Sequence, residues 1–238
     1  MSLTAILLDP ILRAAPARPL VTFYDDATGE RIELSAVTTA NWVAKAANLL
    51  RDECDVEPGG RVAVLLPAHW QTAAVLLAAW SCGAEVVGEP TAADWVLCDR
   101  DRVDLALAAE PSGGVLALSL DAFGRGIDGL PDGVIDFATE VRLHGDEFVP
   151  WEPVPGSAAA LDGMPTAELA SRVADRAAAL GLSAEDRVLS TRDWNIPSDL
   201  LDGLLAVLSA GASLVQVANP DESRLDRRYQ SEKCTVRL

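Results

Sequence analysis

The chain has 238 residues, of which half are hydrophobic and 23% are charged, the composition of a globular protein with a sizeable core. Its formal net charge of −17 opposes phosphate backbones and anionic membrane surfaces, so we expect neither nucleic acid nor membrane as a partner. No apolar run approaches the ~20 residues that span a bilayer, and the N-terminus lacks the basic start of a signal peptide, which predicts a cytoplasmic protein.

The cysteines and histidines form no recognisable metal-binding pattern. They are Cys54, Cys82, Cys98, Cys234, His69 and His144. Because no C-x-x-C pair occurs, zinc-ligand spacing cannot be assembled from them. We therefore expect free, reduced cysteines and no metal site.

Apolar periodicity predicts the elements of the first half of the chain. Residues 3–13 have helical spacing, residues 20–34 read as a hairpin, and a helix capped by Ser35 or Thr38 runs to about residue 51. The same periodicity predicts strands at 62–66, 86–87, 95–98 and 115–118, and helices at 70–82 and 103–109.

The second half begins with a loop-rich joint at residues 121–155, which contains a candidate strand at 141–143. A helix at 166–180 follows, with Thr166 as its expected N-cap. A strand then starts at Arg187, a helical segment runs to about residue 208, and a strand follows 211–212. A charged helix at 222–230 leads to a last strand at 234–238.

Two segments, residues 61–87 and 187–217, share one plan: an Arg-Val start, a strand, a helix, a Gly-Ala pair and a second strand. Short strands alternating with helices favour parallel sheets with right-handed crossovers. The predicted fold is therefore α/β, with two linked lobes of mostly parallel sheet flanked by helices. We place the lobes at roughly 36–150 and at 1–35 plus 151–238.

The order of these segments resembles the first half of the large domain of the adenylate-forming superfamily, which includes acyl-CoA synthetases. The residues that carry the resemblance are NLL at 48–50, PGGRVA at 58–63, WSCGA at 80–84, LGLS at 180–183, RVLST at 187–191 and AGA at 210–212. The chain looks like a short bacterial group related to those enzymes. The resemblance implies ATP or AMP as a ligand, and it implies that the family's second, catalytic half is missing here.

The phosphate-binding loop of that family departs most from its pattern. The corresponding stretch, GSAAALDGMPT at 156–166, has one serine, one threonine and no lysine, and Asp162 would repel phosphate. The family's histidine after the following strand falls on Ile196. We therefore predict a degenerate loop and no bound nucleotide cofactor.

Candidate ligand-binding residues lie where strands end. They are Thr191, Asp193, Trp194, Asn195 and His69, together with Ser157 and Gly163 of the degenerate loop. For Trp194 the alternative is a bent connection with the indole packed between lobes, and for His69 it is a helix cap or a surface residue. No catalytic constellation is predicted.

The first hypothesis for function is a catalytically inactive relative of the adenylate-forming enzymes that binds a small molecule or a protein partner. The second is a synthetase or ligase of that class completed by another chain that supplies the absent motifs, as the exposed edge of the last strand suggests. The partner expected is a protein partner or a second copy in a homo-oligomer. A third is an enzyme of other chemistry built around a cleft near Trp194.

Overall fold

Two β-sheets organise the computed structural model, which describes residues 1–238. The first is ordered β12-β10-β11-β1-β2 and consists of β1 (Pro19–Asp25), β2 (Glu30–Ser35), β10 (Arg187–Ser190), β11 (Ser213–Ala218) and β12 (Val236–Arg237). The second is ordered β7-β6-β5-β3-β4-β8-β9 and consists of β3 (Arg61–Leu65), β4 (Glu85–Val87), β5 (Trp95–Asp99), β6 (Gly114–Leu118), β7 (Val134–Asp136), β8 (Ala159–Leu161) and β9 (Met164–Pro165). Only β1–β2 and β8–β9 pair antiparallel, which confirms the mostly parallel α/β prediction.

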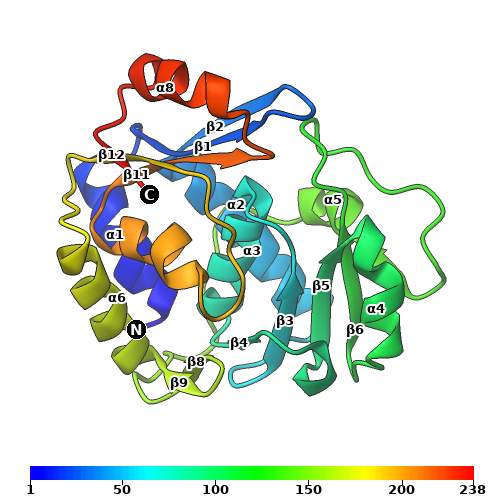
Figure 1. The fold of residues 1–238 in the computed structure, drawn as a ribbon. Helices are drawn as coiled ribbons and strands as arrows, with labels where there is room; N and C mark the ends of the chain where they lie inside the picture. The colour runs from blue at the N-terminus through cyan, green and yellow to red at the C-terminus, as the bar shows by residue number, and fades with distance from the viewer.

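Helices cover the sheets and fill the space between them (Figure 1). They are α1 (Leu3–Ala14), α2 (Ala36–Asp52), α3 (Trp70–Ser81), α4 (Val103–Ala108), α5 (Phe137–Glu140), α6 (Thr166–Ala179), α7 (Ala206–Ser209) and α8 (Glu222–Ser231). A π-helical turn, Leu201–Leu205, leads into α7. None of these helices has the length and apolar character that crossing a bilayer requires.

Helix α3 lies at the centre of the molecule. Its sequence is apolar almost all round, and every residue from Trp70 to Trp80 is buried. A helix without a polar face must be covered on all sides, and α3 contacts α1, α2, β1 and β3. One cluster of 51 buried apolar residues runs through it and takes members from both sheets, so the two sheets share one core.

The two predicted strand–helix–strand units have the same backbone pairing. In the first, β3 pairs parallel with β4, and in the second, β10 pairs parallel with β11. In both units, the first residue of the second strand donates a backbone hydrogen bond to the residue just before the first strand. Glu85 N–H donates to Gly60 O at 2.8 Å, and Ser213 N–H donates to Asp186 O at 3.0 Å. The repeat is therefore present in the structure as well as in the sequence.

The loop-rich joint contains a strand that the sequence pattern did not indicate. The candidate strand at 141–143 is a single helical turn, and β7 pairs with β6 instead. Phe137 and Val141, four residues apart, are both buried on one helical face, and that spacing outweighs the short apolar run at 141–143. The strand prediction for 141–143 was wrong for this reason.

The start of α6 also differs from expectation. Pro165 occupies the N-cap position, and Thr166 is the first helical residue. The Thr166 hydroxyl donates to Ala158 O at 3.0 Å, so it holds the preceding hairpin instead of capping the helix. That hairpin, β8–β9, lies beyond residue 150 but pairs with β4 of the seven-stranded sheet.

Trp194 packs against the π-helical turn. Its side chain is only 3% exposed and belongs to the shared core. A Cβ added to Gly203 of that turn would lie 2.5 Å from Trp194 Cδ1, inside the contact distance of two carbons. The indole therefore occupies space that only glycine leaves free.

We predict that Gly203→Ala lowers the free energy of unfolding by about 1–3 kcal/mol because it overpacks this contact. At an exposed position inside a helix the same change would instead be stabilising by about 1 kcal/mol, so the sign of the effect distinguishes the two situations. Urea denaturation measures the difference. Gly145→Ala is the matched control, because a Cβ there meets nothing within 4 Å. Equal stability of the two variants would contradict the packing described for Trp194.

Candidate functional site

A cavity of about 240 Å³ lies at the carboxyl ends of β1 and β11. Its wall includes Asp25 from β1, Glu30 from β2, His69 from the connection between β3 and α3, and Gln216 from β11. In open α/β sheets ligands bind outside the carboxyl ends of the strands. The cavity therefore occupies the position expected of a ligand site, where the two sheets meet.

His69 is fixed as the N-cap of α3. Its Nδ1 accepts the Gln71 N–H at 3.2 Å, and its ring meets the Phe23 ring edge-on at 4.3 Å. Because Nδ1 is an acceptor, the proton of the neutral ring sits on Nε2. Burial lowers the pKa of His69 below its usual 6.5, although Glu30 opposes that shift. The imidazole is therefore neutral near pH 7, with Nε2–H as a donor.

Three buried polar atoms in this cavity wall have no hydrogen-bond partner. They are His69 Nε2, Glu30 Oε1 and Gln216 Oε1. The first two lie 3.8 Å apart, beyond hydrogen-bond distance. The Gln216 amide nitrogen donates to Arg192 O at 2.9 Å, which leaves its oxygen as the unpaired group. Since a buried unsatisfied group costs about 1–3 kcal/mol, three in one cavity wall indicate a place for a bound molecule or ordered water.

The cavity is negatively charged. Asp25, Glu30 and Asp193 line it, and no lysine or arginine does. Asp25 already accepts the Ala27 N–H at 2.8 Å and the Asn219 side-chain amide at 2.9 Å. The Glu30 carboxylate sits beside the N-cap of α3, where the positive end of the helix dipole favours an anion. This arrangement suits a ligand that donates hydrogen bonds.

The structure brings together three of the residues predicted from the sequence: His69, Thr191 and Asp193 all line the cavity. Trp194, next in the chain, turns into the core. The Asn195 amide donates to Asp199 Oδ2 at 2.7 Å, within its own loop.

Ser157 and Gly163 do not line the cavity. Ser157 precedes the β8–β9 hairpin, and Gly163 lies in its turn. Asp162 and Gly163 both have positive φ, 41° and 80°, and form the two-residue turn of that hairpin. Figure 1 shows the hairpin at the bottom of the view and the β1–β2 hairpin at the top.

Backbone donors of the 156–166 segment are bonded to other parts of the chain. Asp162 N–H donates to Val86 O at 3.0 Å, and Gly163 N–H donates to a Glu85 carboxylate oxygen at 2.5 Å. Asp162 in turn accepts the Gly88 N–H at 3.1 Å. A phosphate cradle needs free backbone N–H groups and positive charge. ATP, which the resemblance implies, does not fit this segment.

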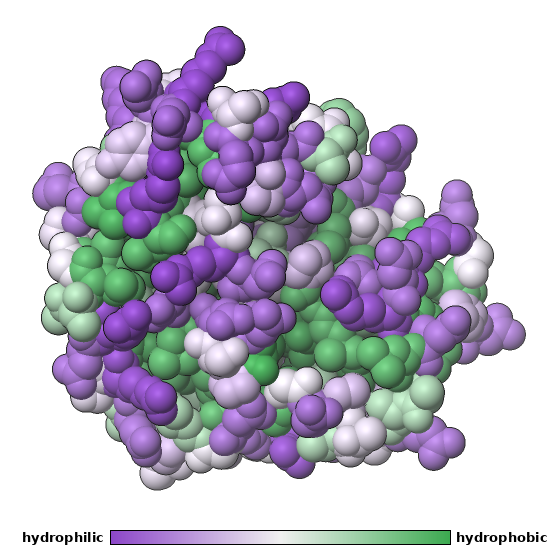
Figure 2. All heavy atoms as spheres, in the orientation of Figure 1, coloured by the Kyte–Doolittle hydropathy of each residue, from purple (hydrophilic) through white to green (hydrophobic).

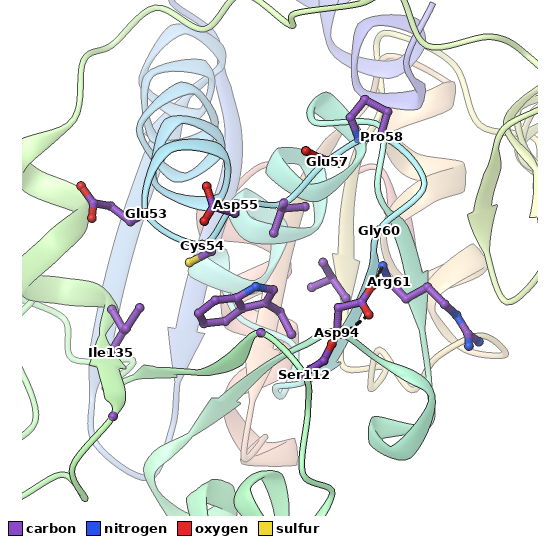
Figure 3. Close-up of a pocket in the computed structure, with 15 residues that line it drawn as sticks. Glu53, Cys54, Asp55, Glu57, Pro58, Gly60, Arg61, Asp94, Ser112 and Ile135 are labelled. Carbon is purple, nitrogen blue, oxygen red and sulfur yellow. Dashed lines mark hydrogen bonds between the residues drawn. The ribbon is translucent and has the colours of Figure 1, made fainter.

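A larger cavity of about 690 Å³ lies at the amino ends of β3 and β5 (Figure 3). Two of its polar side chains already have partners: Asp94 accepts the Arg61 N–H at 2.8 Å and the Ser112 hydroxyl at 3.1 Å. The Arg61 guanidinium lies 3.4 Å from Glu85, and Figure 3 shows it directed away from Glu53 and Asp55. The smaller cavity has unpaired polar atoms and lies at the carboxyl ends of the strands, where ligands usually bind in such sheets. We therefore take the smaller cavity as the candidate site.

The four cysteines are free and buried. Burial raises the pKa of Cys54, Cys82 and Cys98 to about 12 and that of Cys234 to about 11. Thiols held in the protonated form are poor nucleophiles.

Sequence reasoning missed Glu30, Asp25 and Gln216. Gln216 did leave a signal, since it is a polar residue inside the apolar run SLVQVA, and it is only 1% exposed. β1 and β10 lie on opposite sides of β11 in the sheet. Asp25 is the last residue of β1, and Thr191 and Asp193 follow the end of β10. Glu30 left no signal, because only the tertiary fold places β2 beside His69.

Comparisons with known proteins agree with this fold. No model of a protein family matches the chain. Over its whole length the chain superposes on an acyl-CoA synthetase from Brucella canis with a TM-score of 0.81 and 18% identity, covering 47% of that protein. It superposes on the anthranilate CoA ligase AuaEII, solved in complex with anthranoyl-AMP, with a TM-score of 0.75 and 14% identity, covering 49% of it.

The chain thus has the fold of adenylate-forming enzymes over about half their length, as the sequence predicted. A curated relative from Mycobacterium tuberculosis (strain ATCC 25618 / H37Rv), named "TIGR03089 family protein", is 56% identical over 238 residues. The match covers 98% of this chain and 97% of that protein. The chain belongs to the TIGR03089 family.

Proposed function

We propose that this protein binds a small molecule in the cavity at the carboxyl ends of β1 and β11 and does not itself adenylate a carboxylic acid. The observation that carries the proposal is the set of three unpaired buried atoms, His69 Nε2, Glu30 Oε1 and Gln216 Oε1. Folded proteins rarely leave such atoms unpaired away from a ligand or water. Their concentration in one cavity favours binding.

The charge of the same cavity supports the absence of adenylation. Transfer of an adenylyl group releases pyrophosphate, whose developing charge needs cationic side chains, aligned N–H groups or a metal ion. The cavity presents carboxylates instead, and the segment that corresponds to the family's phosphate loop directs N–H groups to Val86 and Glu85. These residues supply no site for the triphosphate.

The alternative is an enzyme completed by a second chain. β12 forms one edge of the five-stranded sheet and pairs only with β10, through Val188 and Val236. An edge strand offers backbone groups to a further strand. Co-purification of a partner that restores ATP-dependent turnover would favour this alternative over simple binding.

We expect no ATP–pyrophosphate exchange when the purified protein is incubated with ATP, Mg²⁺ and a panel of aliphatic and aromatic carboxylic acids, because no lysine or arginine lines the candidate cavity to neutralise the leaving group. Incorporation of labelled pyrophosphate into ATP measures the reaction, and a full-length acyl-CoA synthetase serves as the positive control. Exchange above background that depends on the added acid would contradict the proposal.

The neutral state of His69 predicts a pH dependence of stability. Its folded pKa lies below the unfolded value of 6.5, so on acidification the unfolded chain takes up a proton that the folded protein does not. Below pH 6.5 the free energy of unfolding should therefore fall by up to about 1.4 kcal/mol per pH unit from this group.

Urea denaturation of the wild type and of His69→Gln tests this dependence. The two pH values are 7.5 and 5.5, about one unit either side of the usual pKa of histidine. Asp25 and Glu30, the acidic side chains that line the cavity beside His69, are present in both proteins. We expect the wild type to lose more stability than the variant on acidification. The same loss in both would show that His69 is not held neutral.

A further inference from the structure

Resting on the proposed binding function, we propose that the ligand of this cavity is an uncharged molecule with several hydroxyl groups, such as a sugar or polyol. One hydroxyl would accept from His69 Nε2–H and donate to Glu30 Oε1, and another would donate to Gln216 Oε1. The other buried side-chain atoms without a partner, on Arg18, Trp70 and Trp194, belong to residues that do not line this cavity.

The pair His69 and Glu30 selects for a group that both donates and accepts. His69 Nδ1 is occupied by the Gln71 N–H, so Nε2 is a donor, while the Glu30 carboxylate is an acceptor. The two atoms are 3.8 Å apart, and an oxygen beside that gap reaches both at ordinary hydrogen-bond length. A hydroxyl meets both needs. An ammonium group only donates, and a phosphate or carboxylate only accepts.

Gln216 requires a second donor from the ligand. Its amide nitrogen is bonded to Arg192 O, which fixes the side-chain orientation and leaves Oε1 in the wall. The residue is 1% exposed, so bulk water does not satisfy it. The ligand must therefore carry at least two hydroxyls or equivalent donors.

The charge and size of the cavity narrow the class further. Asp25, Glu30 and Asp193 repel anions, and no lining lysine or arginine offsets them. Phe23 and Leu120 supply apolar wall for the C–H faces of a ring. A volume of about 240 Å³ is well above the ~30 Å³ that one water takes in the liquid, so a molecule of monosaccharide size suits it.

Isothermal titration calorimetry with compounds matched in size tests the class. The neutral members are glucose, mannose and myo-inositol, the anionic members are glucuronate and glucose 6-phosphate, and the cationic member is glucosamine. We expect a neutral member to bind and its anionic counterparts to bind at least about tenfold more weakly. Gln216→Leu should weaken the neutral ligand at least about tenfold, because it removes the buried acceptor.

Ser112→Ala, in the larger cavity, is the matched control and should leave the affinity unchanged. Circular dichroism and the unfolding midpoint establish that each variant is folded. If glucosamine, glucuronate or the phosphate binds best and Gln216→Leu abolishes that binding, the inference on ligand class fails while the binding function stands. If no member of any class binds, both fail. A loss of affinity in Ser112→Ala equal to that in Gln216→Leu would also overturn the assignment.

Discussion

Burial of α3 on every side is the constraint on which the rest of the structure depends. A helix with apolar residues at nearly every position gains most when it is surrounded, at about 25 cal/mol for each Å² of apolar surface removed from water. The chain surrounds α3 with two other helices and strands from both sheets. The N-terminus of α3 consequently opens where the sheets meet, and its N-cap, His69, enters the cavity wall.

This position explains why the cavity is polar although its surroundings are not. A helix N-terminus needs acceptors for its first N–H groups, and His69 supplies one through Nδ1. The same bond commits Nε2 to donate towards β2 and leaves it facing the Glu30 carboxylate across a gap. Hydrophilic side chains cover much of the face shown in Figure 2, and its apolar patches are separate, so that face offers no single broad apolar surface to a partner.

Much of the fold could be predicted from the sequence because strands and helices here follow their apolar periods closely. The repeat at 61–87 and 187–217 was visible because both units begin with Arg-Val and both have a Gly-Ala pair before their second strand. β7 was missed because a strand of three residues is too short to show a clear alternation of apolar and polar residues. The Asp162-Gly163 turn was missed because this segment was compared with the family's phosphate loop, although Asp-Gly is itself typical of a two-residue hairpin turn. Within the site, strand ends indicated Thr191 and Asp193. Glu30 was beyond reach, since its role arises from a contact between elements distant in the chain.

The relation to acyl-CoA synthetases is one of fold, over about half their length. In this chain the segment at 156–166 contains a hairpin, and carboxylates line the candidate cavity. A high-resolution crystal structure of the protein soaked with the neutral compounds would test the central claim most directly. We expect ordered density larger than water within hydrogen-bond distance of His69 Nε2, Glu30 Oε1 and Gln216 Oε1. Isolated waters there, or a direct bond from His69 to Glu30 that closes the gap, would contradict a binding role for this cavity.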